Sequence, residues 1–131
     1  MQKLFLPTMF ATIHAGFPSP ADDFIETKLD LNDYLIKHPA ATYFIRVTGD
    51  SMTNAGIDNE DLLIVDRALQ VYDGSIVIAC VDGEFTLKRV KSINNELYLV
   101  PENSRYYPIK IREEDNLQIF GVVKNVIKKL D

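Results

Sequence analysis

From residue 42 to the C-terminus, the chain is a series of short runs rich in β-branched, aromatic and other apolar residues, separated by turn residues. Such runs between turns are typical of β-strands. Two dipeptides between them, Asp82-Gly83 and Asn94-Asn95, favour tight hairpins because both turn positions need a positive φ. We therefore predict a mainly antiparallel β fold, with strands at residues 42–47, 62–66, 75–81, 84–92, 96–100 and 117–128.

The residues before this region predict a different organisation. Residues 1–28 contain several prolines and no helical periodicity, which indicates a flexible, extended N-terminal arm. The segment 30–38 begins with the N-cap residue Asp30 and is followed by Pro39, so we predict one short helix there. A chain of 131 residues is long enough for one domain with its own core, which we assign to residues 29–131.

Charge and hydrophobicity narrow the classes of function. The chain has 14 Lys and Arg against 19 Asp and Glu, a net charge of −5. This balance disfavours direct, tight nucleic-acid binding, which needs a basic surface. No apolar stretch approaches the ~20 residues that span a bilayer, and Pro7 interrupts the apolar N-terminal run that resembles a secretory signal. We expect a cytoplasmic protein without a membrane anchor. The single Cys80 excludes an internal disulfide and is predicted to be a buried strand residue.

A serine and a lysine stand at positions that suggest a catalytic pair. Ser51 directly follows the predicted strand 42–47, and Lys88 lies within the predicted strand 84–92. A serine hydroxyl is a weak nucleophile until a base takes its proton, and Ser–Lys pairs are one arrangement that does this. A lysine with its ordinary pKa of about 10.4 presents a free amine in only about one molecule in 2,500 at pH 7. Lowering that pKa by ~3 units disfavours the charged form by ~4 kcal/mol, so Lys88 must be desolvated.

The neighbours of Lys88 fit this requirement. Thr86 is two positions away on the same strand face, where its hydroxyl can hydrogen-bond the amine. Arg89 and Lys91 would lower the Lys88 pKa as like charges if they lie close to it. We expect the Ser51 main-chain N–H to form part of an oxyanion hole. Taken by themselves, the two residues are better explained as a turn serine and a solvated strand lysine than as a catalytic pair. An apolar setting for the amine would come from Phe85, Leu87 and Val90.

Other chemistries find little support in the sequence. His14 and His38 are isolated, and neither a metal-ligand cluster nor a glycine-rich phosphate loop is present, so no metal and no cofactor is implied. Asp50, Asp61 and Asp66 stand next to turns, which favours helix caps and surface contacts over catalytic roles.

Several segments of the chain match a known family. They are Ala15-Gly-Phe-Pro-Ser-Pro-Ala21, His38-Pro-Ala-Ala-Thr-Tyr-Phe44, Gly49-Asp-Ser-Met52, Asp61-Leu-Leu-Ile-Val-Asp66, Gly74-Ser-Ile-Val-Ile-Ala79, Val81-Asp-Gly-Glu-Phe-Thr86, Lys88 and Phe120-Gly-Val-Val123. On these segments, residues 15–131 closely resemble the UmuD family, the self-cleaving accessory subunits of error-prone DNA polymerase V, within the wider LexA-like serine peptidases.

The resemblance implies a fold and a site. The fold would consist of strongly bent antiparallel sheets of the LexA/signal-peptidase type, with one short helix and the extended arm. Ser51 would be the nucleophile, Lys88 the general base, and Ala15–Gly16 the bond that is cut. Residues 9–13 would then lie as an added strand along a sheet edge, giving main-chain hydrogen bonds with little demand on side chains.

The resemblance also implies partners. RecA–DNA filaments would stimulate the cleavage in the SOS response to DNA damage. The trimmed homodimer would then join a UmuC-like Y-family DNA polymerase for translesion synthesis, the step behind SOS mutagenesis during DNA repair. No cofactor enters this scheme.

Two alternatives share parts of this chemistry. A LexA-type repressor needs a DNA-binding module before the cut, and a helix-turn-helix of ~20 residues does not fit an arm that contains Pro7. A signal-peptidase-like enzyme needs a membrane anchor. A third alternative is a non-catalytic dimeric interaction module, for which cleavage is no more than a switch.

Overall fold

The structure, a computed structural model, describes residues 9–11, 15–16, 25–28 and 30–131. Its contacts divide the chain into two units, residues 1–37 and residues 38–131. The predicted boundary between arm and domain, after residue 28, stays a prediction.

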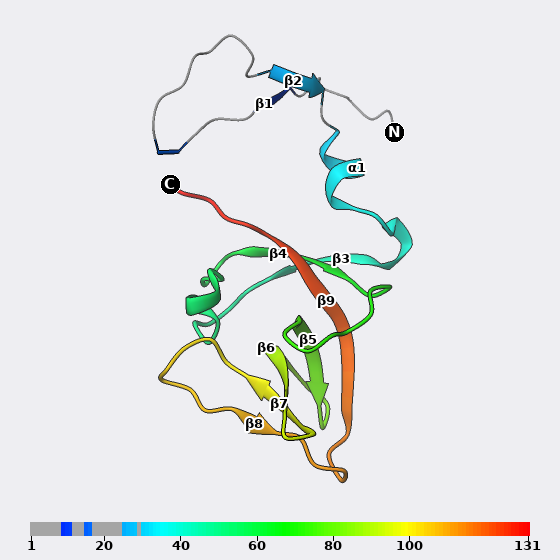
Figure 1. The fold of residues 1–131 in the computed structure, drawn as a ribbon, viewed down its shortest axis with the longest axis vertical. Helices are drawn as coiled ribbons and strands as arrows, with labels where there is room; N and C mark the ends of the chain where they lie inside the picture. Colours follow the sequence, from blue (N-terminus) through cyan, green and yellow to red (C-terminus); the bar gives the residue numbers. More distant parts are fainter. Residues whose placement is uncertain (1–8, 12–14, 17–24, 29) are drawn as a thin grey trace. The chain divides into compact units, whose positions relative to one another are not determined.

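The described residues of the first unit form two short strands and a helix. Strand β1 (Met9–Ala11) pairs antiparallel with β2 (Ile25–Lys28), with Met9 opposite Lys28 (Figure 1). Strand β1 falls within residues 9–13, which we expected to add as a strand to a sheet edge. Its partner β2, within the predicted arm, was not predicted.

The helix α1 (Leu31–Leu35) begins where the sequence predicts. The Asn32 N–H donates to Asp30 Oδ1 at 3.0 Å, which confirms Asp30 as the N-cap. The helix ends before His38, earlier than predicted, because Ile36 adopts an extended conformation and its N–H closes the last turn on the Asn32 carbonyl.

The second unit is built on one seven-stranded antiparallel sheet with the order β3-β4-β9-β5-β6-β7-β8. Six of its strands lie within one residue of their predicted bounds, and β8, which has only two residues, was not predicted. The strands are β3 (Thr42–Arg46), β4 (Leu62–Asp66), β5 (Ile76–Val81), β6 (Glu84–Ile93), β7 (Glu96–Val100), β8 (Ile109–Lys110) and β9 (Leu117–Ile127); two 3₁₀ helices, η1 and η2, span Pro39–Ala41 and Thr53–Ala55.

Both predicted hairpins are confirmed. Asp82 and Gly83 have φ values of 49° and 86° between the paired residues at the ends of β5 and β6. Asn94 and Asn95, with φ values of 52° and 63°, turn the chain from β6 to β7. The first hairpin fixes the register of β6 against β5, and this register places Lys88 opposite a core residue of β5.

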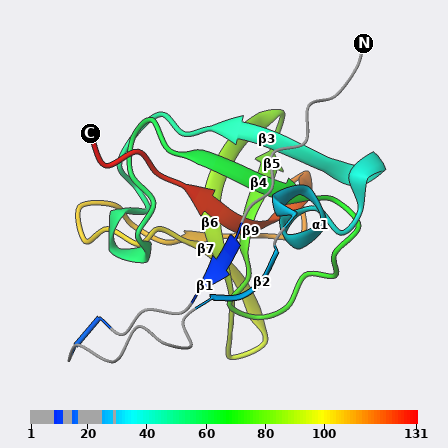
Figure 2. The same cartoon turned by 90° about the horizontal axis from the view of Figure 1, so that it is seen from above.

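The sheet is strongly bent along β9, as the fold prediction requires. The first half of β9 pairs with β5 and its second half with β4, and each pairing contains a register shift (Figure 1). Strands β5 and β6 therefore run steeply across the direction of β3 and β4 (Figure 2). Gly121 lies between the two shifts, where a Cβ atom would stand 2.6 Å from Val65 Cγ1, closer than packed carbon atoms approach.

Two apolar clusters form the core of this unit. The first directly underlies the segment that carries Ser51, because Met52 is one of its members and is only 1% exposed. Cys80 lies on β5 as predicted but is half-buried rather than buried, since its partner across the hairpin, Phe85, is itself exposed. No helix in the described part of the chain is long and apolar enough to cross a membrane. The first cluster contains Met52, Ile57, Leu63, Val65 and Ile78, and the second contains Val77, Ala79, Val90, Leu99 and Val122.

Candidate active site

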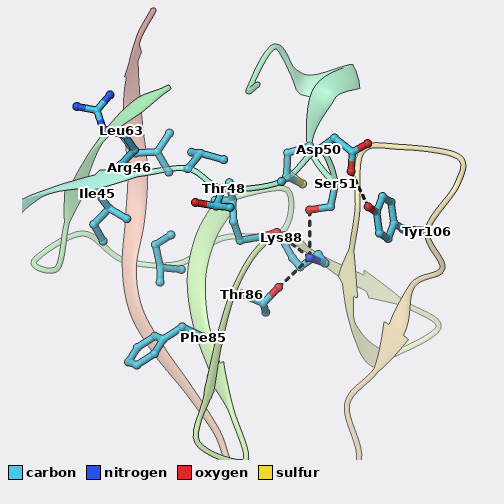
Figure 3. Close-up of a pocket in the computed structure, with 15 residues that line it drawn as sticks. Ile45, Arg46, Thr48, Asp50, Ser51, Leu63, Phe85, Thr86, Lys88 and Tyr106 are labelled. Atoms are coloured by element: carbon cyan, nitrogen blue, oxygen red, sulfur yellow. Dashed lines mark hydrogen bonds between the residues drawn. The ribbon is translucent and has the colours of Figure 1, made fainter. Parts of the chain in front are cut away.

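The structure brings Ser51 and Lys88 into contact. Lys88 Nζ lies 3.3 Å from Ser51 Oγ, although the serine follows β3 and the lysine comes from β6 (Figure 3). The same amine donates hydrogen bonds to Thr86 Oγ1 at 2.8 Å and to the Leu87 carbonyl oxygen at 3.1 Å. The hydrogen bond from the amine to Thr86 agrees with the expectation that this hydroxyl bonds Lys88.

These three contacts fit either protonation state of the Lys88 amine. A neutral lysine has two N–H groups and one lone pair, whereas the ammonium form has three N–H groups and no acceptor. Thr86 and Leu87 supply acceptors for two N–H groups. The third direction points to Ser51 Oγ, so deprotonation of Lys88 leaves a lone pair that can receive the serine proton.

Burial makes that deprotonation easier. Lys88 pairs across the ladder with Val77, which is 0% exposed, and burial lowers the pKa of Lys88 below its ordinary value of 10.5. The hypothesis that Arg89 and Lys91 contribute as like charges is wrong, because burial is the only cause of the shift. The Arg89 guanidinium is instead paired with Glu102, at 2.6 Å.

A lowered lysine pKa has a consequence for stability. Between the folded and unfolded pKa values of Lys88, the unfolded chain binds more protons, so stability rises with pH in that interval. At pH values below the folded-state pKa, Lys88 is charged in both states, and burial of that charge lowers the stability by its full amount. Lys88→Met should therefore raise the melting temperature at pH 7, and this advantage should shrink as the pH approaches 10.5. Calorimetry across this pH range checks it.

Lys91 offers a matched control for this measurement. It lies on the same strand, is also half-buried, and does not contact Ser51. Lys91→Met should not reproduce the pH-dependent gain. An equal gain in both variants, or a gain for Lys88→Met that stays constant up to pH 10.5, would contradict the assignment.

The pair opens into a cleft of about 420 Å³. Its apolar wall comes from β3, β4, β5 and β6, and its polar wall comes from the segment that carries Ser51 together with Tyr106 (Figure 3). Phe85 belongs to the lining and is 69% exposed. Such a cleft suits an extended peptide with small or apolar side chains. Its apolar lining residues include Ile45, Val47, Leu63, Ile78 and Leu87.

The motif Gly49-Asp-Ser-Met52 has a structural reason at both ends. Gly49 has a φ of 108°, which strains any other residue, and its N–H donates to Asn59 Oδ1 at 2.9 Å. Met52 anchors the other end in the first apolar cluster. Ser51 is therefore held between a turn that requires glycine and a buried side chain.

The three aspartates set aside as caps or surface contacts behave differently from one another. Asp61 and Asp66 are buried, at 5% and 1% exposure, so their placement at the surface was wrong. A hydrogen bond from Lys128 is the main cause that lowers the pKa of Asp61. Burial by itself would raise the pKa of Asp66, but hydrogen bonds, chiefly from His38, outweigh it and lower that pKa. Both aspartates stabilise the fold away from the cleft.

Asp50 contacts residues that sequence reasoning missed. Tyr106 Oη donates to Asp50 Oδ1 at 2.5 Å, and Asn103 Nδ2 donates to the Asp50 carbonyl oxygen at 2.7 Å. Both donors come from the loop between β7 and β8, and no pattern in the sequence relates that loop to Ser51. The predicted cleavage-site residues, Ala15 and Gly16, are both exposed and lie in a bend of the first unit.

A serine and a half-buried lysine in contact at a cleft form one of the arrangements that can activate a serine hydroxyl. The Peptidase S24-like family matches residues 7–124, most of the chain. The chain therefore belongs to the Peptidase S24-like family, and its relatives place it in the UmuD branch, as the sequence resemblance predicted.

Three relatives illustrate this similarity. Protein SamA of Salmonella typhimurium is 51% identical over 115 residues, which cover 88% of this chain and 79% of SamA. Protein ImpA of Salmonella typhimurium is 49% identical over 119 residues, 88% of this chain and 78% of ImpA. Protein MucA of Escherichia coli is 42% identical over 120 residues, 90% of this chain and 81% of MucA.

Proposed function

We propose that the chain is a serine endopeptidase that cuts its own arm between Ala15 and Gly16, with Ser51 as nucleophile and Lys88 as general base. The contact of 3.3 Å between Lys88 Nζ and Ser51 Oγ carries this proposal. Membership in the Peptidase S24-like family supports it, because this is a family of peptidases.

The residues suggest an order of steps. Ser51 Oγ attacks the carbonyl carbon of Ala15 while its proton passes to the neutral amine of Lys88. The C–N bond to Gly16 then breaks, and the Lys88 ammonium returns the proton to the departing amine of Gly16. Water attacks the resulting ester on Ser51, again with Lys88 as base, which frees the Ala15 carboxylate and restores the hydroxyl.

A substrate within the same chain, or in a dimer mate, changes what the cleft has to do. The effective concentration of the arm replaces affinity for a diffusing substrate, so one turnover per chain is sufficient. Small side chains at Ala15 and Gly16 let the backbone enter a narrow cleft. The fraction of time that the arm occupies the cleft then sets the rate.

Membership in the UmuD branch motivates the proposed partners. RecA–DNA filaments would stimulate the cut in the SOS response by raising the population in which the arm occupies the cleft. Residues 16–131 would then act as a homodimer that joins a UmuC-like Y-family polymerase in translesion synthesis. If RecA filaments restored cleavage in Ser51→Ala, this account of stimulation would fail.

Self-cleavage should depend on pH in a defined direction. The purified intact chain, held between pH 7 and 10.5, should yield two fragments by mass spectrometry, one ending at Ala15 and one starting at Gly16. Only the neutral amine accepts the serine proton, so the rate should rise with pH and level off below 10.5, since burial lowers the pKa of Lys88.

Two results would speak against the proposal. One is a set of fragments with other ends, which would indicate a different scissile bond or a contaminating protease. The other is the absence of cleavage at every pH and with RecA filaments, which would favour the non-catalytic interaction module.

A further inference from the structure

The sheet by itself does not fix the distance between the two members of the dyad. Ser51 follows β3 and Lys88 lies on β6, and three strands, β4, β9 and β5, lie between these two in the sheet. The sheet is also bent along β9. A reaction that depends on sub-ångström alignment needs a shorter connection between the two residues.

The loop between β7 and β8, residues 101–108, makes that connection. The Glu102 N–H donates to the Ser51 carbonyl oxygen at 2.8 Å, and the Glu102 carbonyl oxygen accepts from the Asn54 N–H at 2.7 Å. The Glu102 carboxylate also accepts from Arg89 Nε at 2.6 Å, and Arg89 directly follows Lys88 on β6. One residue of this loop therefore bonds the segment of the nucleophile and the strand of the base.

Two further side chains of the loop act on Asp50, the residue before the nucleophile. Asn103 Nδ2 donates to the Asp50 carbonyl oxygen at 2.7 Å. Tyr106 Oη donates to the Asp50 carboxylate at 2.5 Å (Figure 3). The Asp50 carbonyl and the Ser51 N–H belong to one planar trans peptide and point in opposite directions. Asn103 therefore fixes the direction of the Ser51 N–H as well as the position of its backbone.

We propose that Asn103 and Tyr106 are positioning residues, which hold the Ser51 hydroxyl and N–H in the orientation that the reaction needs. This inference depends on the proposed self-cleavage. Neither side chain hydrogen-bonds the Ser51 hydroxyl or the Lys88 amine: Asn103 bonds the main chain of Asp50, and Tyr106 bonds its side chain. Their loss should lower the rate at which a properly deprotonated dyad reacts, without changing how readily Lys88 loses its proton.

Two substitutions separate this role from a purely structural one. Asn103→Asp keeps the oxygen that accepts from the Arg105 N–H at 2.9 Å, so the turn within the loop is preserved. It removes the donor to the Asp50 carbonyl and the longer bond, at 3.4 Å, to Thr53 Oγ1. Tyr106→Phe keeps the ring at the cleft and removes only the hydroxyl. The neighbouring Tyr107 is 86% exposed, and Tyr107→Phe is the matched control.

The test is the pH profile of self-cleavage in the intact, full-length chain. Its plateau reports the reactivity of the aligned dyad, and its midpoint reports the deprotonation of Lys88. The hydrogen bond to Asp50 raises the pKa of Tyr106, so the wild-type tyrosine keeps its proton well into the alkaline range. Both variants should lower the plateau by about 10-fold or more, Tyr106→Phe without moving the midpoint, and Tyr107→Phe should match the wild type.

The outcomes distinguish the inference from the proposed function. If both variants reached the same plateau rate of cleavage as the wild type, while Ser51→Ala still did not cleave, the positioning role alone would be overturned. A raised midpoint in Tyr106→Phe would show that water has reached Lys88, which would also overturn it in favour of a structural role. Cleavage that persists in Ser51→Ala would overturn the proposed function itself. Because Tyr106 is 45% exposed, Tyr106→Phe leaves the core intact and carries the test if Asn103→Asp does not fold.

Discussion

Replacing Ser51 with alanine is expected to abolish self-cleavage, with a fall in rate of at least about 10³-fold. The substitution removes the only oxygen within reach of Lys88 Nζ that the proposed mechanism uses as nucleophile. Ser51 is half-buried in a turn and is not part of either apolar cluster, so the fold should be retained. Mass spectrometry at the pH of maximal wild-type rate measures the loss.

Ser104 supplies a serine control for this result. It is exposed and lies in the loop between β7 and β8, so Ser104→Ala should cleave at the wild-type rate. Lys88→Ala should fall as far as Ser51→Ala, and the double variant no further, because the two residues act as one unit. If folded Ser51→Ala still released the fragment that starts at Gly16 at a rate near that of the wild type, the assignment of Ser51 and Lys88 as a catalytic pair would be wrong.

Met52→Ala is expected to lower the free energy of unfolding by about 2–5 kcal/mol, the usual cost of cutting a large buried side chain back to alanine. Met52 is 1% exposed and packs in the cluster that contains Leu63 and Ile78. Met52 is also the residue directly after the nucleophile Ser51, so its truncation opens a cavity directly beneath the cleft. Urea denaturation, with the slope compared between variants, measures the change.

A volume-conserving substitution provides the comparison. Met52→Leu should cost less than about 1.5 kcal/mol, since the site keeps an apolar side chain of similar size. Equal losses in Met52→Ala and Met52→Leu would mean that the thioether itself, rather than the filled volume, matters at this position.

The strands of this fold were predictable because their determinants are local. Each run carries β-branched and apolar residues between turn residues, and the dipeptides Asp82-Gly83 and Asn94-Asn95 fix two hairpins by their positive φ values. β8 escaped prediction because a two-residue strand has no periodicity to detect. Strand β2 escaped because its segment was interpreted as part of an extended arm, and the bend at Gly121 depends on packing against Val65.

The site was predictable only in part, for a similar reason. Ser51 and Lys88 were proposed from a motif and a resemblance, and Thr86 from the alternation of side chains along a strand. Asn103 and Tyr106 lie about fifty residues from Asp50 in a polar loop, and only the folded chain brings them to it. Arg89 was expected to act through its charge on Lys88, whereas its bond to Glu102 gives it a mechanical role.

The length of the exposed Asp82-Gly83 turn matters for the site, because this hairpin sets which face of the sheet carries Lys88. Side chains along β6 alternate between the two faces of the sheet, so if one residue were inserted or removed and β6 slipped by one residue against β5 to keep a two-residue turn, the Lys88 amine would move to the opposite face. A change of two residues would keep the face and move the amine along the strand. An insertion that the turn absorbs would leave Lys88 in place, whereas one that shifts the register by a single residue would remove the base from the cleft.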